Sequence, residues 1–80
     1  MIAFECCWVS GQVAVRLNAL DATQAGQEAA RVMAELYAMG RPLVLASNLL
    51  HRMVGLHNPV TGELAAIVVP RPARQVQPQG

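Results

Sequence analysis

The sequence predicts an α+β fold in which one helix packs across a mostly antiparallel sheet, with elements in the order β-β-α-β-β-β. Apolar and polar residues alternate with period two on both sides of a Ser-Gly pair at 10–11, which is typical of a hairpin. A capped amphipathic helix follows over 21–40, and three short apolar segments complete the chain. We therefore expect a single domain over 1–70 and a flexible tail rich in Pro, Arg and Gln over 71–80.

The first two strands are predicted to pair through a tight two-residue loop at 10–11. That register places Glu5 opposite Arg16, an opposite-charge cross-strand pair, and Cys7 opposite Ala14 on the same face. The other face is wholly apolar, so its aromatic residues are expected to be buried. Its predicted pairs are Phe4 with Leu17, Cys6 with Val15 and Trp8 with Val13.

The stretch DATQAGQEAARVMAELYAMG predicts the helix. Asp21 is a suitable N-cap, and Gln24 three residues later completes a capping-box pattern. Gly40 and Pro42 predict the C-terminal stop. The side expected to face the sheet is apolar and comprises Ala25, Ala29, Val32, Met33, Leu36 and Met39.

The remaining strands are predicted from their apolar runs. PLVLAS is apolar on both faces, which favours a central position in the sheet. LHRMVGL and ELAAIVV are expected to form a hairpin, because the linking HNPVTG combines a turn-favouring Asn-Pro with a Gly suited to positive φ.

The composition favours contact with another protein. The chain is 54% apolar and only 14% charged, against about 25% charged in ordinary domains, so some apolar surface is expected to meet a partner or a second copy. One candidate surface is a small-residue stripe on the helix, which has the alternative interpretation of a neutral helix flank. Another is the sheet face that the helix leaves open, and exposed strand edges are a third. The candidate residues are Ala30, Ala34, Tyr37 and Ala38 on the helix and Cys7, Ala14, Arg16 and Asn18 on the sheet.

The two cysteines, Cys6 and Cys7, are adjacent. Neighbouring residues of a strand point to opposite faces, so the pair is not suited to share a metal ion or to form a redox disulfide. We expect Cys6 to be a small core residue and Cys7 to be a free thiol on the other face, as a reducing cytoplasm permits. No metal site is predicted.

No catalytic or cofactor motif is apparent. His51 and His57 on one strand would lie roughly 20 Å apart, too far to share a metal ion. No serine, cysteine or carboxylate is placed by the sequence to complete a catalytic site, and the glycines form no phosphate-binding loop. The protein is therefore predicted to be neither an enzyme nor a cofactor binder; the alternative is acid–base chemistry by either histidine at a dimer cleft.

The charge distribution bears on nucleic-acid binding and on location. The net charge is +1, and the second half of the chain holds Arg41, Arg52, Arg71 and Arg74 against Glu63 alone. These arginines permit the alternative of a small nucleic-acid-associated regulator, although no exposed aromatic platform accompanies them. The sequence shows neither a signal-peptide pattern nor an apolar run of membrane-spanning length, so a cytoplasmic location is expected.

A hairpin that ends in the stretch QVAVRLNALDATQAGQEAARVMAELYAMGRPLVLAS, about half of the chain, resembles in layout several small phage-encoded inhibitors, in particular anti-CRISPR proteins of Pseudomonas phages. The shared layout is two strands, an Asp-led alanine-rich helix closed by glycine, and a further strand. The resemblance implies a non-catalytic protein that binds a CRISPR effector subunit, and it transfers no individual functional residue. Many such inhibitors that block nucleic-acid binding are acidic, and this chain is not. The sequence thus favours a small protein-binding module, with a phage or mobile-element inhibitor as its sharpest form and a homodimeric adaptor as an alternative.

Overall fold

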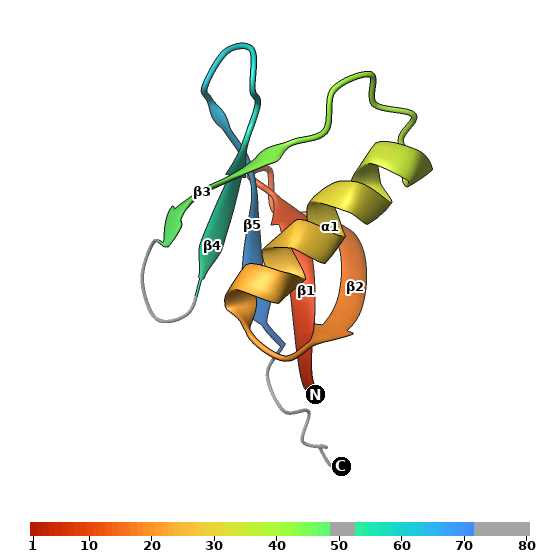
Figure 1. Ribbon diagram of the computed structural model, residues 1–80, viewed down its shortest axis with the longest axis vertical. Helices are drawn as coiled ribbons and strands as arrows, with labels where there is room; N and C mark the ends of the chain where they lie inside the picture. Colours follow the sequence, from red (N-terminus) through yellow and green to blue (C-terminus); the bar gives the residue numbers. More distant parts are fainter. Residues whose placement is uncertain (49–52, 72–80) are drawn as a thin grey trace.

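The computed structural model describes residues 1–48 and 53–71 and shows one helix on one face of a five-stranded antiparallel sheet (Figure 1). The elements are β1 (Ile2–Trp8), β2 (Val13–Ala19), α1 (Ala22–Leu36), β3 (Val44–Asn48), β4 (Val54–His57) and β5 (Leu64–Pro70). The predicted α+β class and element order are confirmed. The strands lie in the order β2-β1-β5-β4-β3, so β2 and β3 are the sheet edges. The predicted tail from 71 stays a prediction, because 72–80 lie outside the described residues.

The expectation that PLVLAS forms a central strand is wrong. β3 lies at the edge, and β5 takes the central position between β1 and β4. The physical difference is that β3 (VLASN) ends in two polar residues whereas LAAIVV in β5 has none, and a strand that is apolar on both faces suits the buried centre of a sheet. The hairpin that joins β4 to β5 is as predicted: the Asn58 side chain accepts hydrogen bonds from Val60 and Thr61, and Gly62 adopts a φ of 78°.

The β1–β2 hairpin has the predicted register over most of its length, but two predicted pairs next to the loop, Cys7 with Ala14 and Trp8 with Val13, are wrong. Cys7 lies opposite Val13 and not opposite Ala14. The loop has three residues, since the Trp8 N–H donates to the Gln12 carbonyl over 2.8 Å. The longer loop shifts the pairing by one residue, and a bulge at Ala14 restores it. The confirmed pairs are Phe4 with Leu17, Glu5 with Arg16 and Cys6 with Val15.

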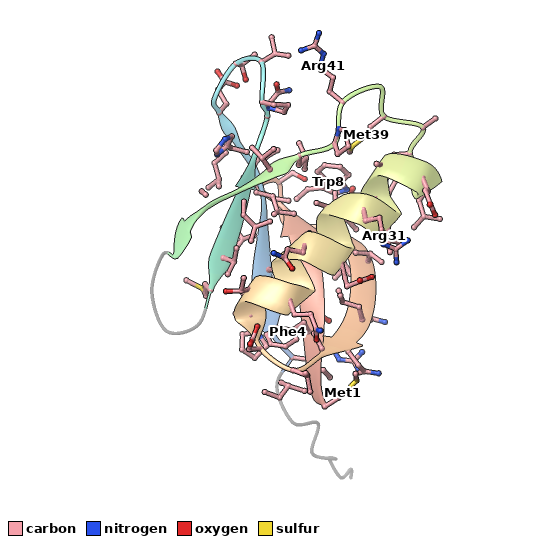
Figure 2. All side chains as sticks on the ribbon, in the orientation of Figure 1. Met1, Phe4, Trp8, Arg31, Met39 and Arg41 are labelled. Atoms are coloured by element: carbon pink, nitrogen blue, oxygen red, sulfur yellow. The ribbon has the colours of Figure 1, made fainter. Side chains whose placement is uncertain are left out.

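The core lies between α1 and the sheet. Phe4 and Cys6 are buried, as the hairpin register predicts. Trp8 is only half-buried: it lies under the C-terminal end of α1, near Met39 (Figure 2), and its ring meets Tyr37 edge-on at 5.4 Å between centroids. The remaining buried apolar residues are Ala19, Ala25, Ala29, Ala30, Met33, Leu43, Val54, Leu56, Ala66 and Val68.

The buried side of α1 differs from the predicted side. Ala25, Ala29 and Met33 face the sheet as expected, but Leu36 is 63% exposed, and Gly26 is buried in the helix–sheet interface. A Cβ atom on Gly26 would lie 3.1 Å from Val54 Cγ1 and 3.2 Å from Leu45 Cδ2. The helix is therefore rolled to bring its smallest residues against β3 and β4, which turns Leu36 away from the sheet.

The helix also ends four residues before the predicted stop at Gly40. Leu36 is the last helical residue, and Ala38 adopts a left-handed φ of 51°. The Met39 N–H donates to the Ala34 carbonyl over 2.9 Å, and the Ala38 N–H donates to the Glu35 carbonyl over 3.4 Å. This is a Schellman arrangement in which alanine occupies the place that glycine usually takes.

Replacing Ala38 with glycine is expected to raise the free energy of unfolding by about 0.5–1 kcal/mol, because glycine adopts positive φ without the Cβ clash that alanine suffers. Urea denaturation followed by circular dichroism measures this. The matched control Ala34→Gly lies inside α1 and should lose about 1 kcal/mol. A destabilised Ala38→Gly variant would contradict the left-handed end of the helix.

Candidate functional site

The candidate site is a groove of about 500 Å³ between α1 and the edge strand β3, which we call the α1–β3 groove. Its surface is almost entirely apolar. Arg31 projects from the middle of α1, and Arg41 from the loop that leads into β3 (Figure 2). The lining residues are Gln27, Ala30, Arg31, Ala34 and Glu35 on α1 and Pro42, Leu43, Val44 and Leu45 on the β3 side.

The groove exists because small side chains line the helix where it passes β3. Ala30 and Ala34 fill little space, while the contact at Gly26 holds α1 close to Leu45. Charged groups border this apolar floor. Arg31 donates to Glu28 over 2.6 Å and lies 3.8 Å from Glu35, so the rim is held by exposed ion pairs within the helix.

The two edges of the sheet differ. On β2 the Ala14 bulge interrupts the edge, and the Tyr37 hydroxyl donates to the Ala14 carbonyl over 2.9 Å. Bulges and capped backbone groups are means by which proteins block an edge strand. The pairing of β3 with β4 is irregular between Leu45 and Asn48, but Val44 is 39% exposed, and among the described residues no backbone hydrogen bond outside the sheet ladders involves the strand. The β3 edge, directly beside the groove, is the edge available for pairing.

The structure divides the predicted helix surface. Ala30 is buried and Ala34 is half-buried in the α1–β3 groove. Tyr37 and Ala38 lie beyond the end of α1, where Tyr37 contacts Trp8 and Ala38 forms the turn. The four residues therefore do not form one continuous stripe. The β3 side of the groove was not predicted, because the apolar pattern of PLVLAS favours a central strand. The proline in the short loop between α1 and β3 is the sequence feature that could have indicated an edge strand.

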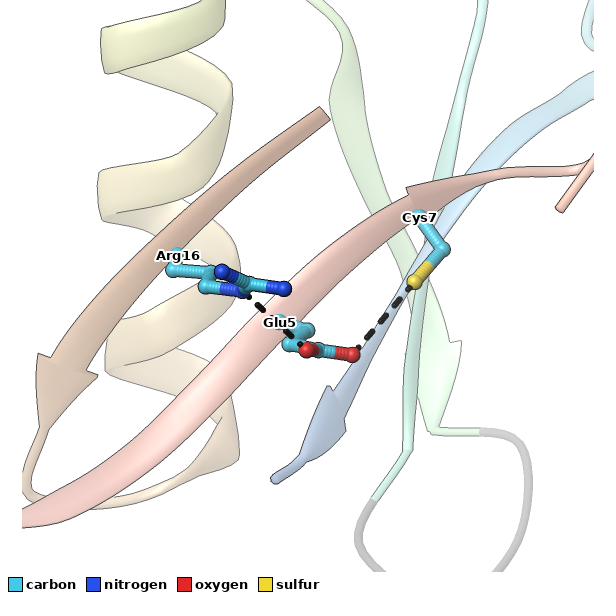
Figure 3. A network of polar contacts seen from close by, with 3 residues as sticks. All are labelled: Glu5, Cys7 and Arg16. Carbon is cyan, nitrogen blue, oxygen red and sulfur yellow. Dashed lines mark hydrogen bonds and ion pairs between the residues drawn. The ribbon is translucent and has the colours of Figure 1, made fainter. Parts of the chain in front are cut away.

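Arg16 and Cys7 lie on the sheet face opposite α1, and Glu5 lies between them (Figure 3). Arg16 Nε donates to Glu5 Oε2 over 3.2 Å, and the Cys7 thiol lies 3.9 Å from Glu5 Oε1. Burial raises the pKa of Cys7, and the Glu5 charge raises it further. Cys7 is therefore a protonated thiol at neutral pH and a weak nucleophile.

The cysteines occupy opposite faces of β1, as predicted. Cys6 is buried in the core with its Sγ 3.4 Å from Met33 Sδ, and both cysteines are free. Burial raises the pKa of Cys6 to about 12. The two thiols therefore lie on opposite sides of the sheet and are not placed to share a metal ion or to form a disulfide with each other.

Within the described ranges, no three or more His, Cys, Asp or Glu side chains gather closely enough to hold a metal ion. His57 is half-buried on the face opposite α1, paired with Val44 and Leu64. His51 lies outside the described residues, so the predicted separation of the two histidines stays a prediction.

The two described arginines of the nucleic-acid alternative, Arg41 and Arg71, lie far apart. Arg41 lies in the loop before β3, at one end (Figure 2). Arg71 lies at the other end, where its N–H donates to the Ala3 carbonyl over 2.8 Å. Arg52 and Arg74 are outside the described residues. Arg41 and Arg71 therefore do not join into one basic patch.

No known protein family matches this sequence, and no significant similarity links it to curated proteins or to solved structures. In the part of the chain that the structure describes, α1 falls short of the length and apolarity that a membrane-crossing helix requires.

Proposed function

We propose that this protein is a small non-catalytic protein-binding module that takes up an extended segment of a partner at the α1–β3 groove. The observation that carries the proposal is the location of an available strand edge directly beside an apolar groove. Strand addition to a sheet edge, with side chains inserted into an adjacent helix–strand groove, is a recurrent mode of peptide recognition.

In this mode the partner's backbone pairs with β3, and its alternate side chains point into the groove, because side chains of a strand alternate between faces. Ala30 and Ala34 leave room for aliphatic side chains there. The intervening side chains of the partner point to the other face of the sheet, away from α1 and the groove, where contact with solvent favours polar residues. The expected ligand is therefore an extended segment with aliphatic residues at every second position.

The sharper form of the proposal is a phage or mobile-element inhibitor that acts in the cytoplasm by occupying a surface of a host defence complex such as a CRISPR effector. Its support is the layout resemblance of the stretch from 12 to 47 together with the small size and low charge of the chain. Affinity capture from a bacterial lysate with an active CRISPR complex tests it: stoichiometric retention of an effector subunit by the wild type, and its loss with Ala34→Trp, are expected.

The groove itself is tested with peptides selected from a random peptide display library. Selected peptides should alternate aliphatic and polar residues and should shift the amide resonances of Val44 and Leu45. Ala34→Trp fills the groove and should weaken binding at least about tenfold, equivalent to about 1.4 kcal/mol. Val60→Trp, a loop residue 68% exposed and remote from the groove, is the matched control and should bind normally. Equal affinity of both variants would refute the groove as the binding site.

A further inference from the structure

The sheet face opposite α1, which we call the open face, is a second surface without a covering layer. Cross-strand pairing identifies its members, since directly paired residues share a face. Cys7 is paired with both Val13 and Ile67, and Glu5 with both Arg16 and Val69. The members are Ala3, Glu5, Cys7, Val13, Arg16, Asn18, Val44, Gly55, His57, Leu64, Ile67 and Val69.

The middle of the open face is apolar. An antiparallel sheet with one wet face normally alternates apolar and polar residues along each strand. The central strand β5 does not, because Ile67 and Val69 point to the open face while Ala66 and Val68 point to the core. Toward the rim of the same face, Val13 on β2 and Leu64 at the start of β5 are 42% and 40% exposed. The Ala14 bulge adds to this character, because it places Val13 beside Cys7.

The charges of the open face neutralise each other. Glu5 and Arg16 form an ion pair over 3.2 Å, and no other described strand position on this face carries a fixed charge. A neutral apolar face offers no attraction to nucleic acid or to an anionic lipid surface. It also presents no like-charge repulsion to a second copy of itself.

The area of the open face is large enough for a stable dimer interface. Five strands at about 4.8 Å spacing, four to seven residues long, cover roughly 24 Å by 20 Å. Two such faces in contact bury on the order of 900 Å² in flat projection. Side chains that protrude from the sheet add accessible area to this projection. The total accessible area buried in the dimer is then about 1,000–1,200 Å², which is the lower end of the range for stable interfaces.

We propose that the open face joins two copies of this chain, sheet against sheet, around a two-fold axis. The dimer then has four layers, helix–sheet–sheet–helix, with the two sheets about 10 Å apart. Both α1–β3 grooves face the outer layers, and Val44 is the one residue that the groove and the open face share. This dimer goes beyond the proposed function and does not depend on it, but if both hold, the protein presents two grooves to its partners.

Analytical ultracentrifugation tests the dimer. The wild type should sediment as a species of about twice the 8.6 kDa chain mass, and Ile67→Lys should sediment as a folded monomer. Val60→Lys places the same charge in an exposed loop and should remain dimeric. If Ile67→Lys does not fold, Val13→Lys serves in its place, because Val13 is already 42% exposed in the single chain.

The groove variant separates this proposal from the proposed function. Ala34→Trp should lose peptide binding and keep the dimer, whereas Ile67→Lys should lose the dimer and keep peptide binding per chain. A wild type that is monomeric at about 200 μM would overturn the open-face dimer, because this concentration is well above the μM dissociation constants of modest interfaces. Dimers that persist in Ile67→Lys or Val13→Lys would also overturn it. Dissociation of the dimer by Ala34→Trp would overturn it as well, because it would place the contact between the two copies at β3.

Discussion

Replacing Gly26 with leucine is expected to lower the free energy of unfolding by about 3 kcal/mol. The first side-chain atom alone would lie 3.1 Å from Val54 Cγ1 and 3.2 Å from Leu45 Cδ2, so a larger side chain has no space unless α1 lifts from the sheet. Gly26→Ala should be nearly neutral, because the gain of about 1 kcal/mol in helix propensity is offset by the cost of displacing the buried Val54 and the neighbouring Leu45 side chains slightly. Urea denaturation of the two variants measures the difference.

Thr23→Leu is the matched control for Gly26→Leu, since it adds a leucine at an exposed position of the same helix. Its stability should stay within about 0.5 kcal/mol of the wild type. A fully stable Gly26→Leu variant would contradict the close approach of α1 to β3. The approach also has a functional consequence: because Gly26 contacts Leu45 at the edge of the groove, a lifted helix should weaken peptide binding in any variant that still folds.

Local patterns in the sequence were enough to predict the hairpin and the start of the helix. Glu5 and Arg16 are neighbours as expected, because alternation and charge pairing both act over a few residues. The Asp21 carboxylate accepts from the Gln24 N–H over 2.8 Å, and the Gln24 side chain accepts from the Leu20 N–H, which completes the local cap. These features depend on near neighbours, and near neighbours are visible in the sequence.

The wrong predictions have in common that they depend on tertiary packing. The roll of α1 is set by Gly26 against β3 and β4, and it leaves Leu36 exposed although Leu36 belongs to the apolar period. The edge position of β3 depends on the insertion of β5 between β1 and β4, which no local pattern specifies. The groove forms between two elements misjudged in this way. Two residues of the predicted helix surface, Ala30 and Ala34, line the groove, while its strand side was not predicted.

The protein is expected to lose stability as the pH rises above about 9, and Cys6 is the reason. Burial raises the pKa of Cys6 from 9.0 to about 12, so the thiol stays neutral in the fold at pH values where the unfolded chain ionises. When folding raises the pKa of an acidic group, the group does not change the free energy of unfolding at pH values below its unfolded-state pKa. Between the unfolded-state and folded-state pKa values it lowers the free energy of unfolding as the pH rises. The free energy of unfolding should therefore fall by about 1.4 kcal/mol per pH unit between pH 9 and 12, up to roughly 4 kcal/mol.

Urea denaturation under reducing conditions at a series of pH values measures this slope, and two cysteine variants assign it. Cys6→Ala is less stable at pH 7 because it leaves a small cavity beside Met33, but it should lack the alkaline slope that Cys6 causes. Cys7→Ser removes the half-buried thiol, whose pKa is also raised, and should retain the larger part of the slope. Parallel curves for the wild type and Cys6→Ala would show that Cys6 is not the group whose ionisation opposes folding. The core position of this thiol beneath α1 would then be wrong, since burial is the largest cause of its raised pKa, ahead of the neighbouring Cys7.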